Sequence, residues 1–370
     1  MQAYFDYSAT TPLDSRVKAL LMEAFDHAFN AGATYPSALV QRQYLESARQ
    51  DFATSIGADS REVVFLSGAT EANNLAIKGA VSHHEAKNPR VITVQTEHKA
   101  VLDPVGILAK SGVKTEFLPV LPLGLLDLDV LAKALSGVKT TLVSVMAVNN
   151  ETGVVQDIRA IADVVHEHGA KLHVDAAQAL GKMRVDVRAW DADMVSFSGH
   201  KVYAPMGIGA LYVRRLPKMR LQAMQHGGGQ ERGLRSGTSP VPLIRAFALA
   251  TQLAQEEHEM RLARVEALSK ALCDNLPTGI TRHVSHQQKV PHIENLALPI
   301  NAQSALAQAA QMGIALSAGS ACQSGNGASH VLQAMGLETA SAGLRVSLSH
   351  LTTDSELKAL LHFLNHLVNP

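Results

Sequence analysis

Short apolar runs alternate with amphipathic stretches along most of the chain. β-Branched and aromatic runs predict buried strands, and apolar positions three and four residues apart predict helices. Strands are expected at 63–66, 90–95, 115–120, 141–148, 171–174, 194–197 and 208–214. Helices are expected at 15–29, 39–56, 70–81, 98–109, 128–135 and 157–168. This alternation predicts an α/β fold in which a mainly parallel seven-stranded sheet is covered by helices on both faces.

The pattern changes after this alternating region. A long helical stretch is expected from about 241 to 276, and a polar segment rich in His and Gln follows at 277–291. The remainder predicts a small α+β unit, with strands at 292–298 and 343–349 and helices at 302–312, 328–335 and 354–368. A chain of 370 residues with 46% apolar content is long enough for two cores. We therefore expect a large domain at 12–255 and a small domain made of 1–11 and 256–370.

Charge and hydropathy exclude several classes of partner. Lys plus Arg and Asp plus Glu are balanced at 33 each, so no overall field would attract nucleic acid or a membrane surface. No apolar run approaches the roughly 20 residues that span a bilayer, and the first dozen residues lack a signal-peptide pattern, so a cytoplasmic protein is expected. The 17 histidines include no HExxH motif and no Cys/His quartet, so no metal site is expected.

The two cysteines lie in different contexts and form no disulfide framework. Cys273 belongs to the helical segment EALSKALCDNL, where a packed structural thiol is expected. Cys322 belongs to SAGSACQSGNGASH, a loop of small residues in which a thiol can be exposed and reactive. An ordinary loop cysteine remains the alternative for Cys322.

Polar residues follow five of the predicted strands at their carboxyl ends. These groups are Ser67–Thr70, Glu97–His98, Asn149–Glu151, Asp175 with Gln178, and Ser198 with His200 and Lys201. Ligands bind beyond such strand ends in parallel sheets, so one pocket is expected to collect these side chains. Ser67–Thr70 opens a predicted helix, whose free amides can hold a phosphate.

Lys201, within SFSGHKVYAP, follows a buried strand directly. An amine at the floor of a cleft can form a Schiff base with a carbonyl compound. Asp175 can keep a pyridine nitrogen protonated, and His98 can stack on the ring, so the set predicts pyridoxal phosphate. The alternatives are a surface position for Lys201 and a helix-capping role for His98. Arg345, in the predicted strand GLRVSLS, can bind a substrate carboxylate in bidentate fashion or form an ordinary salt bridge.

Nine segments, in one order along nearly the whole chain, resemble the cysteine desulfurases, which are pyridoxal-phosphate enzymes of the class V aminotransferase group with fold type I. They are DYSATTP, FLSGATEANNLAIKG, TEHKAVL, VNNETGVVQDI, HVDAAQ, SFSGHKVY, GGGQERGLRSGT, GSACQSG and GLRVSL. The resemblance implies that Lys201 carries the cofactor, Asp175 pairs with its ring nitrogen and His98 stacks on the ring. It also implies that Asn150 and Gln178 contact the ring substituents.

The same resemblance extends to the cofactor phosphate and to oligomeric state. It implies that Thr70, Ser198 and His200 hold the phosphate from the same subunit and that Ala69 also belongs to the cofactor-binding residues. It further implies that Thr238 reaches this phosphate from the other subunit of a homodimer.

The reaction implied by the resemblance converts L-cysteine to L-alanine. Cys322, on a loop of the small domain, would take the sulfur as a persulfide for an acceptor protein, while Asn150 and Arg345 would bind the substrate. One alternative is a selenocysteine lyase or another class V lyase or aminotransferase that does not depend on Cys322. A second alternative is a non-catalytic paralogue that binds sulfur-transfer proteins.

The chain also departs from the family pattern. Tyr35 and Gln41 stand where many relatives carry a GNP-type segment and a histidine, and Ser349 with His350 follows RVSL where an arginine is common. Pro370 comes soon after the last predicted helix, where housekeeping relatives extend further. These departures reduce the expected docking surface and charge complementarity. We therefore expect poor sulfur transfer to a scaffold of iron–sulfur cluster assembly and service to another acceptor.

Overall fold

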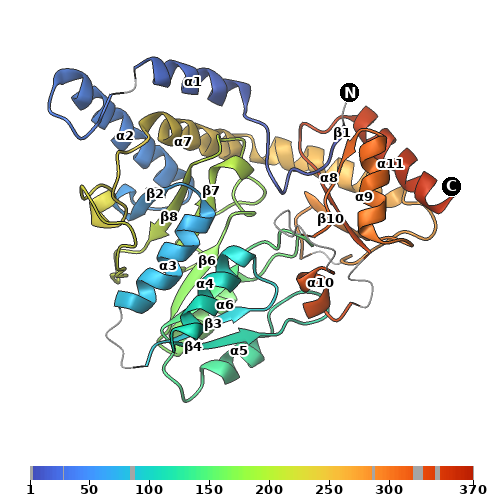
Figure 1. Ribbon diagram of the computed structural model, residues 1–370, viewed down its shortest axis with the longest axis horizontal. Coiled ribbons are helices and arrows are strands. Elements are labelled where there is room, and N and C mark those ends of the chain that lie inside the picture. Colours follow the sequence, from blue (N-terminus) through green and yellow to red (C-terminus); the bar gives the residue numbers. More distant parts are fainter. Residues whose placement is uncertain are drawn as a thin grey trace.

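The computed structural model describes residues 3–27, 29–83, 88–285, 288–319, 328–337 and 342–369. Its largest element is a seven-stranded sheet with the strand order β2-β8-β7-β6-β5-β3-β4 (Figure 1). The strands are β2 (Val63–Leu66), β3 (Arg90–Val94), β4 (Lys114–Leu118), β5 (Leu142–Met146), β6 (Lys171–Asp175), β7 (Met194–Ser198) and β8 (Gly209–Val213). From β4 to β7 all neighbours are parallel, and only β8 runs antiparallel to β7 and β2. The predicted α/β fold with a mainly parallel seven-stranded sheet is confirmed.

Helices cover both faces of this sheet. One layer consists of α1 (Ser15–Asp26), α2 (Pro36–Ser55), α5 (Leu128–Leu135), α6 (Ile158–Glu167) and α7 (Val241–Glu256). The other layer consists of α3 (Ala69–His83) and α4 (Lys99–Lys110). In the first layer the ring of Phe52 on α2 lies 4.7–5.9 Å from the rings of Phe65, Phe197 and Phe247. This aromatic cluster joins α2 and α7 to the sheet through buried apolar area.

A second hydrophobic cluster lies at the other end of the molecule (Figure 1). It is built from α8 (His258–Asp274), β10 (Ile293–Ala297), α9 (Ala302–Gln311), β11 (Ile314–Ala315), β12 (Gly343–Ser347) and α11 (Asp354–Val368), together with β1 (Ala3–Tyr4). Strand β10 lies between β12 and β9 (Thr281–Arg282) in a three-stranded antiparallel sheet. The short helix α10 (His330–Ala334) packs with Val154 and Val284 in a smaller cluster. The domain limits at 12–255 and 256–370 remain a prediction.

The long helix expected from 241 to 276 is in fact two helices. Glu257 separates α7 from α8 with φ −94° and ψ 9°. The apolar side chains of α7 belong to the core of the large sheet, and those of α8 belong to the second cluster. The break therefore lies where the chain passes from one core to the other, which periodicity within either half does not reveal.

The N-terminal segment connects the second cluster to the large sheet. β1 pairs in parallel with β11, and Asp6 forms an isolated bridge with Ser347. Farther along, the Thr11 amide donates to the His200 carbonyl at 2.8 Å, just beyond the end of β7. Strands of two residues such as β1 are too short to show an alternating pattern, so they were not predicted. Within the described ranges, no helix is long and apolar enough to cross a membrane.

Candidate active site

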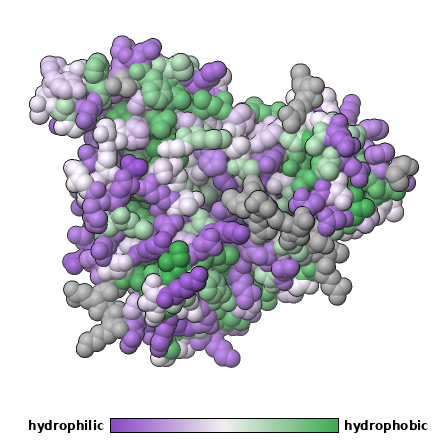
Figure 2. All heavy atoms as spheres, viewed as in Figure 1, coloured by the Kyte–Doolittle hydropathy of each residue, from purple (hydrophilic) through white to green (hydrophobic). Residues whose placement is uncertain are grey.

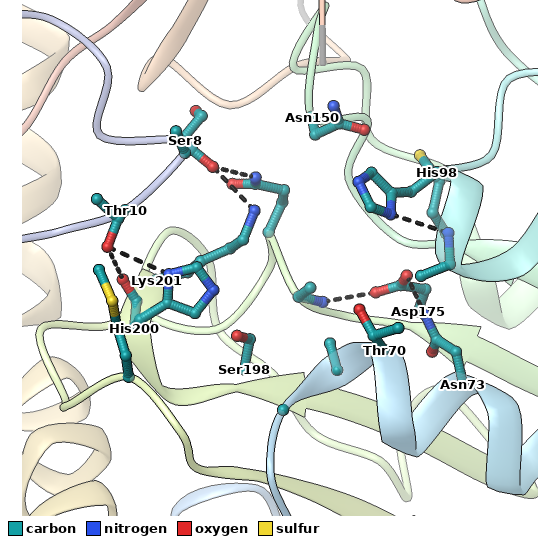
Figure 3. Close-up of a pocket in the computed structure, with 18 of the residues that line it drawn as sticks. Ser8, Thr10, Thr70, Asn73, His98, Asn150, Asp175, Ser198, His200 and Lys201 are labelled. Atoms are coloured by element: carbon teal, nitrogen blue, oxygen red, sulfur yellow. Dashed lines mark hydrogen bonds between the residues drawn. The ribbon is translucent and has the colours of Figure 1, made fainter. Parts of the chain in front are cut away.

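A cavity of about 510 Å³ lies beyond the carboxyl ends of β5, β6 and β7. Figure 3 shows Lys201 and His98 on opposite sides of it, with Thr70 and Ser198 at its lower end in that view. The sequence-predicted residues that line the cavity are Ala69, Thr70, His98, Asn150, Asp175, Gln178, Ser198, His200, Lys201 and Arg345. Thr238 is exposed and does not line it. Cys322 lies outside the described residues.

Lys201 ends a short 3-10 turn, Gly199–Lys201, that follows β7 directly. Its Nζ donates to the Ser8 carbonyl at 2.9 Å, and Gln178 Nε2 donates to the same oxygen at 2.8 Å. The residue after Lys201 is closely packed: a Cβ built on Gly181 would come within 2.7 Å of Val202 Cγ2. The N-terminal segment thus holds the lysine side chain at the cavity wall.

Asp175 is the last residue of β6, and it is buried. Its Oδ2 accepts a hydrogen bond from Asn73 Nδ2 at 2.7 Å, and its Oδ1 accepts one from the Ala177 amide at 2.9 Å. Asn73 is fully buried on α3. Charge-assisted hydrogen bonds of this kind fix a carboxylate in one orientation. Sequence reasoning missed Asn73, because only the packing of α3 on the sheet brings it to Asp175.

His98 caps the N-terminus of α4 and also lines the cavity. The capping role is therefore compatible with a place beside the cofactor ring. Its Nδ1 accepts from the Ala100 amide at 3.1 Å, which leaves the proton of the neutral ring on Nε2. Burial lowers the pKa of His98; the nearby Asp175 charge opposes this shift and the Lys201 charge adds to it. The imidazole is therefore neutral at pH 7.

One end of the cavity combines a helix N-terminus with small side chains. Ala69 and Thr70 open α3 directly after Gly68, and Ser198 faces them from the end of β7. Strand β8 packs directly against Gly68: a Cβ built on Gly209 would come within 2.6 Å of the Gly68 Cα. A helix start with free amides suits an anionic group such as a phosphate.

His200 stands at the same end of the cavity. Its Nδ1 lies 3.2 Å from Thr10 Oγ1. Burial lowers the pKa of His200 to about 4, and the charges of Lys201 and Lys182 act in the same direction. The neutral ring can donate or accept a hydrogen bond there without adding charge.

Arg345 lines the cavity from β12, in the second cluster. Its Nη1 donates to the Asn150 carbonyl at 3.0 Å, and its Nη2 pairs with Asp6 Oδ1 at 2.7 Å. The predicted salt bridge is therefore present, and it leaves Nε buried without a hydrogen-bond partner among the described residues. Sequence reasoning missed the contribution of Asp6, Ser8 and Thr10, because the N-terminal segment reaches the cavity only through tertiary folding.

Comparisons with known proteins agree with this geometry. The family model for aminotransferase class-V matches residues 3–360. The chain is 42% identical to cysteine desulfurase IscS of Edwardsiella ictaluri over 363 aligned residues. This alignment covers 96% of this chain and 89% of the relative. It is also 42% identical over 366 residues to cysteine desulfurase IscS of Pseudoalteromonas translucida, with 96% and 89% covered.

Solved structures show the same architecture. A NifS-like protein superposes with a TM-score of 0.93 at 31% identity, over 100% of both chains. A structure of SspA in complex with cysteine superposes with a TM-score of 0.83 at 35% identity, over 95% of this chain and 100% of that one. The chain belongs to the class V aminotransferase family and, within it, to the cysteine desulfurases.

Proposed function

We propose that the chain converts L-cysteine to L-alanine and passes the sulfur, as a persulfide on Cys322, to an acceptor protein. The observation that carries this proposal is the meeting of the Lys201 amine, the buried Asp175 carboxylate and the N-terminus of α3 at one cavity. Membership of the family supports the same chemistry. The solved complex of SspA with cysteine supports L-cysteine as the substrate.

Enzymes of this family depend on pyridoxal phosphate, and the residues at the cavity fit that cofactor. The cavity volume of about 510 Å³ lies in the range of small-molecule sites. Gln178 Oε1 and Ser8 Oγ are buried without hydrogen-bond partners among the described residues, so polar atoms remain for a ligand or water to satisfy. When bound, the cofactor supplies an electron sink for the negative charge that develops on the substrate α-carbon.

The cavity residues divide the task of holding this cofactor. Lys201 would bind its carbonyl carbon, and Asp175, oriented by Asn73, would keep its ring nitrogen protonated. Asn150 and Gln178 would contact the ring substituents. Ala69, Thr70, Ser198 and His200 would hold the phosphate.

Proton transfer would fall to Lys201, with His98 beside the cofactor ring. The Lys201 amine, which the Ser8 carbonyl holds at the cavity wall, would accept the substrate α-proton. His98 is neutral and presents Nε2–H, so it can support the ring and donate a hydrogen bond without adding charge. Arg345 and Asn150 would bind the substrate carboxylate.

The described residues on either side of Cys322 support its role as sulfur acceptor. The Arg345 amide donates to the Ser317 carbonyl at 2.8 Å, which anchors the chain five positions before Cys322 at a cavity-lining residue. On the other side, His330 Nε2 lies 3.0 Å from the Glu97 carbonyl, next to His98. The described residues before and after the segment that carries Cys322 are therefore bonded at or beside cavity-lining residues.

We also propose a homodimer. Seven large apolar side chains are 40–59% exposed on α1, α2 and the loop between them: Met22, Phe25, Phe29, Tyr35, Leu39, Val40 and Tyr44. Figure 2 shows hydrophobic residues gathered along the upper edge of the molecule, where these helices lie. A patch of this kind marks an interface. A second copy packed there would also explain why Thr238 is exposed and does not line the cavity of its own chain.

The decisive assay measures alanine and sulfide released from L-cysteine, with L-selenocysteine as a parallel substrate. The proposal expects both products from L-cysteine, and a persulfide on Cys322 detectable by mass spectrometry. Borohydride reduction should place the pyridoxyl mass on Lys201, with Lys182 as the internal control lysine. Turnover of selenocysteine alone would refute the desulfurase assignment in favour of a selenocysteine lyase.

A further inference from the structure

The loop that carries Thr238 contains two adjacent residues in a strained backbone conformation. Glu231 and Arg232 have φ angles of 46° and 56°, and Gly233 follows with 80°. Glycine adopts such angles freely, whereas other residues do so only where their surroundings hold them. The contacts of the Glu231 and Arg232 side chains therefore hold the backbone in this conformation.

Glu231 is anchored by a buried ion pair. Arg49 of α2 donates to its two carboxylate oxygens at 2.7 and 2.8 Å, and both side chains are only 4% exposed. The Phe65 amide donates to Glu231 Oε2 at 2.9 Å, so both carboxylate oxygens accept hydrogen bonds. Bidentate contacts of this type define position and orientation together.

Arg232 binds the same strand. Its Nη2 donates to the Val63 carbonyl at 2.6 Å, and Arg49 Nη1 donates to that oxygen at 3.1 Å. Strand β2 is an edge strand of the large sheet, and Val63 and Phe65 present their backbone groups outward. The side chains of Glu231, Arg232 and Arg49 thus occupy the hydrogen-bonding edge that another strand would otherwise use.

A second anchor lies closer to Thr238. Arg235 Nε pairs with Glu71 Oε1 at 3.2 Å, and the Gly237 amide donates to Gln230 Oε1 at 2.9 Å. Thr238 follows directly and is exposed. The loop is therefore fixed on β2 and α3 at Glu231, Arg232 and Arg235, a few residues before the exposed Thr238.

We infer that Glu231 is a positioning residue for the active site of the partner subunit: clamped by Arg49 at the edge of β2, it holds Thr238 where a second copy of the chain needs it for the cofactor phosphate. The inference rests on the proposed cofactor and homodimer. It predicts that weakening the clamp affects the cofactor in trans, at the partner's cavity, and not in the subunit that carries the change.

The test uses heterodimers with one competent site. A subunit with Lys201 is combined with a subunit carrying Lys201→Ala, and the mixed dimer is purified through a different affinity tag on each subunit. Binding of pyridoxal phosphate is then titrated by visible absorption. Glu231→Gln is placed either in the Lys201→Ala subunit or in the competent one. Loss of one charge-assisted contact predicts a Kd about 10- to 100-fold higher in the first arrangement, and a Kd within about twofold of the parent in the second.

Two further variants complete the design. Glu46→Gln is the matched control, because Glu46 is 61% exposed and contacts the same Arg49 from the solvent side at 3.5 Å, so neither arrangement should change the Kd. Arg232→Ala, which keeps the ion pair, replaces Glu231→Gln if that subunit does not fold, with a smaller effect in trans. Weakening in cis, or equally in both arrangements, would overturn the inference, because Glu231 would then only maintain its own subunit. A monomeric chain, or no visible band in the parent heterodimer, would overturn the proposed dimer or cofactor instead, and the inference with it.

Discussion

Gly209 is a position at which one added methyl group should weaken cofactor binding. It lies on β8 between Leu66 of β2 and Ser198 of β7, next to Gly68 at the end of the cavity that we propose holds the cofactor phosphate, here called the phosphate end. In Gly209→Ala the new Cβ would stand 2.6 Å from the Gly68 Cα and 2.6 Å from the Phe197 carbonyl oxygen. Both neighbours are backbone, so no rotamer change relieves the contact.

The size of the effect follows from these distances. Ordinary contact begins at 3.4 Å, so Gly68 must move by about 0.8 Å relative to β8. Overpacking of this type destabilises a protein by about 1–3 kcal/mol. Because a displacement near 1 Å at a reacting site can lower a rate by about 100-fold, we expect cofactor affinity and alanine formation to fall about 10- to 100-fold.

The assay pairs a cofactor titration with thermal unfolding of the same samples. Gly106→Ala is the matched control, because Gly106 lies inside α4 with no atom within 4 Å of its built Cβ. That variant should keep the parent's cofactor affinity and gain about 0.5–1 kcal/mol of stability from helix propensity. If Gly209→Ala binds pyridoxal phosphate as tightly as the parent, the phosphate end does not depend on the contact between β8 and Gly68, and the reasoning fails.

Three other predictions concern buried polar groups. Asn73→Leu removes the 2.7 Å bond to Asp175 and should raise the cofactor Kd about 10-fold or more. Asn74→Leu, which removes a hydrogen bond from Nδ2 to the Thr70 carbonyl one turn away, should change the Kd less, and equal effects would contradict the orienting role of Asn73. Burial lowers the pKa of Lys182 to about 7, and its Nζ has no hydrogen-bond partner among the described residues. The unfolded chain therefore binds this proton more tightly, and Lys182→Met should stabilise the apoprotein by a few kcal/mol below pH 7, with the gain vanishing toward pH 10.5; a loss of stability in urea titrations at pH 7 would show that the ammonium has a favourable partner. Burial also lowers the pKa of His173 to about 4, so the unfolded state takes up a proton below pH 6.5 while the folded state does not, and stability falls between pH 6.5 and 4 by about 3 kcal/mol. His173→Asn should flatten that part of the pH–stability curve, and an unchanged slope from pH 7 to 4.5 would refute the assignment.

The sequence predicted what depends on local pattern. Strand and helix alternation was sufficient for the seven-stranded sheet, because apolar periodicity reports directly which face of an element is buried. It also predicted that polar residues after β5, β6 and β7 would share one cavity, because carboxyl ends of parallel strands lie at the same edge. Asp175, Lys201 and His98 meet there as expected. Their roles follow from the family resemblance and are still to be tested.

Tertiary structure decided what depends on contacts between distant segments. No local signal brings Ser8 to Lys201, 193 positions away, or Asp6 to Arg345, 339 positions away. The break at Glu257 and the clamp between Arg49 and Glu231 have the same origin, since each depends on which core or strand edge lies nearby. The sequence by itself therefore determined the sheet and the polar residues at its edge. Packing alone decided how those residues are oriented, because hydrogen-bond geometry depends on the register of whole elements rather than on neighbours in the chain.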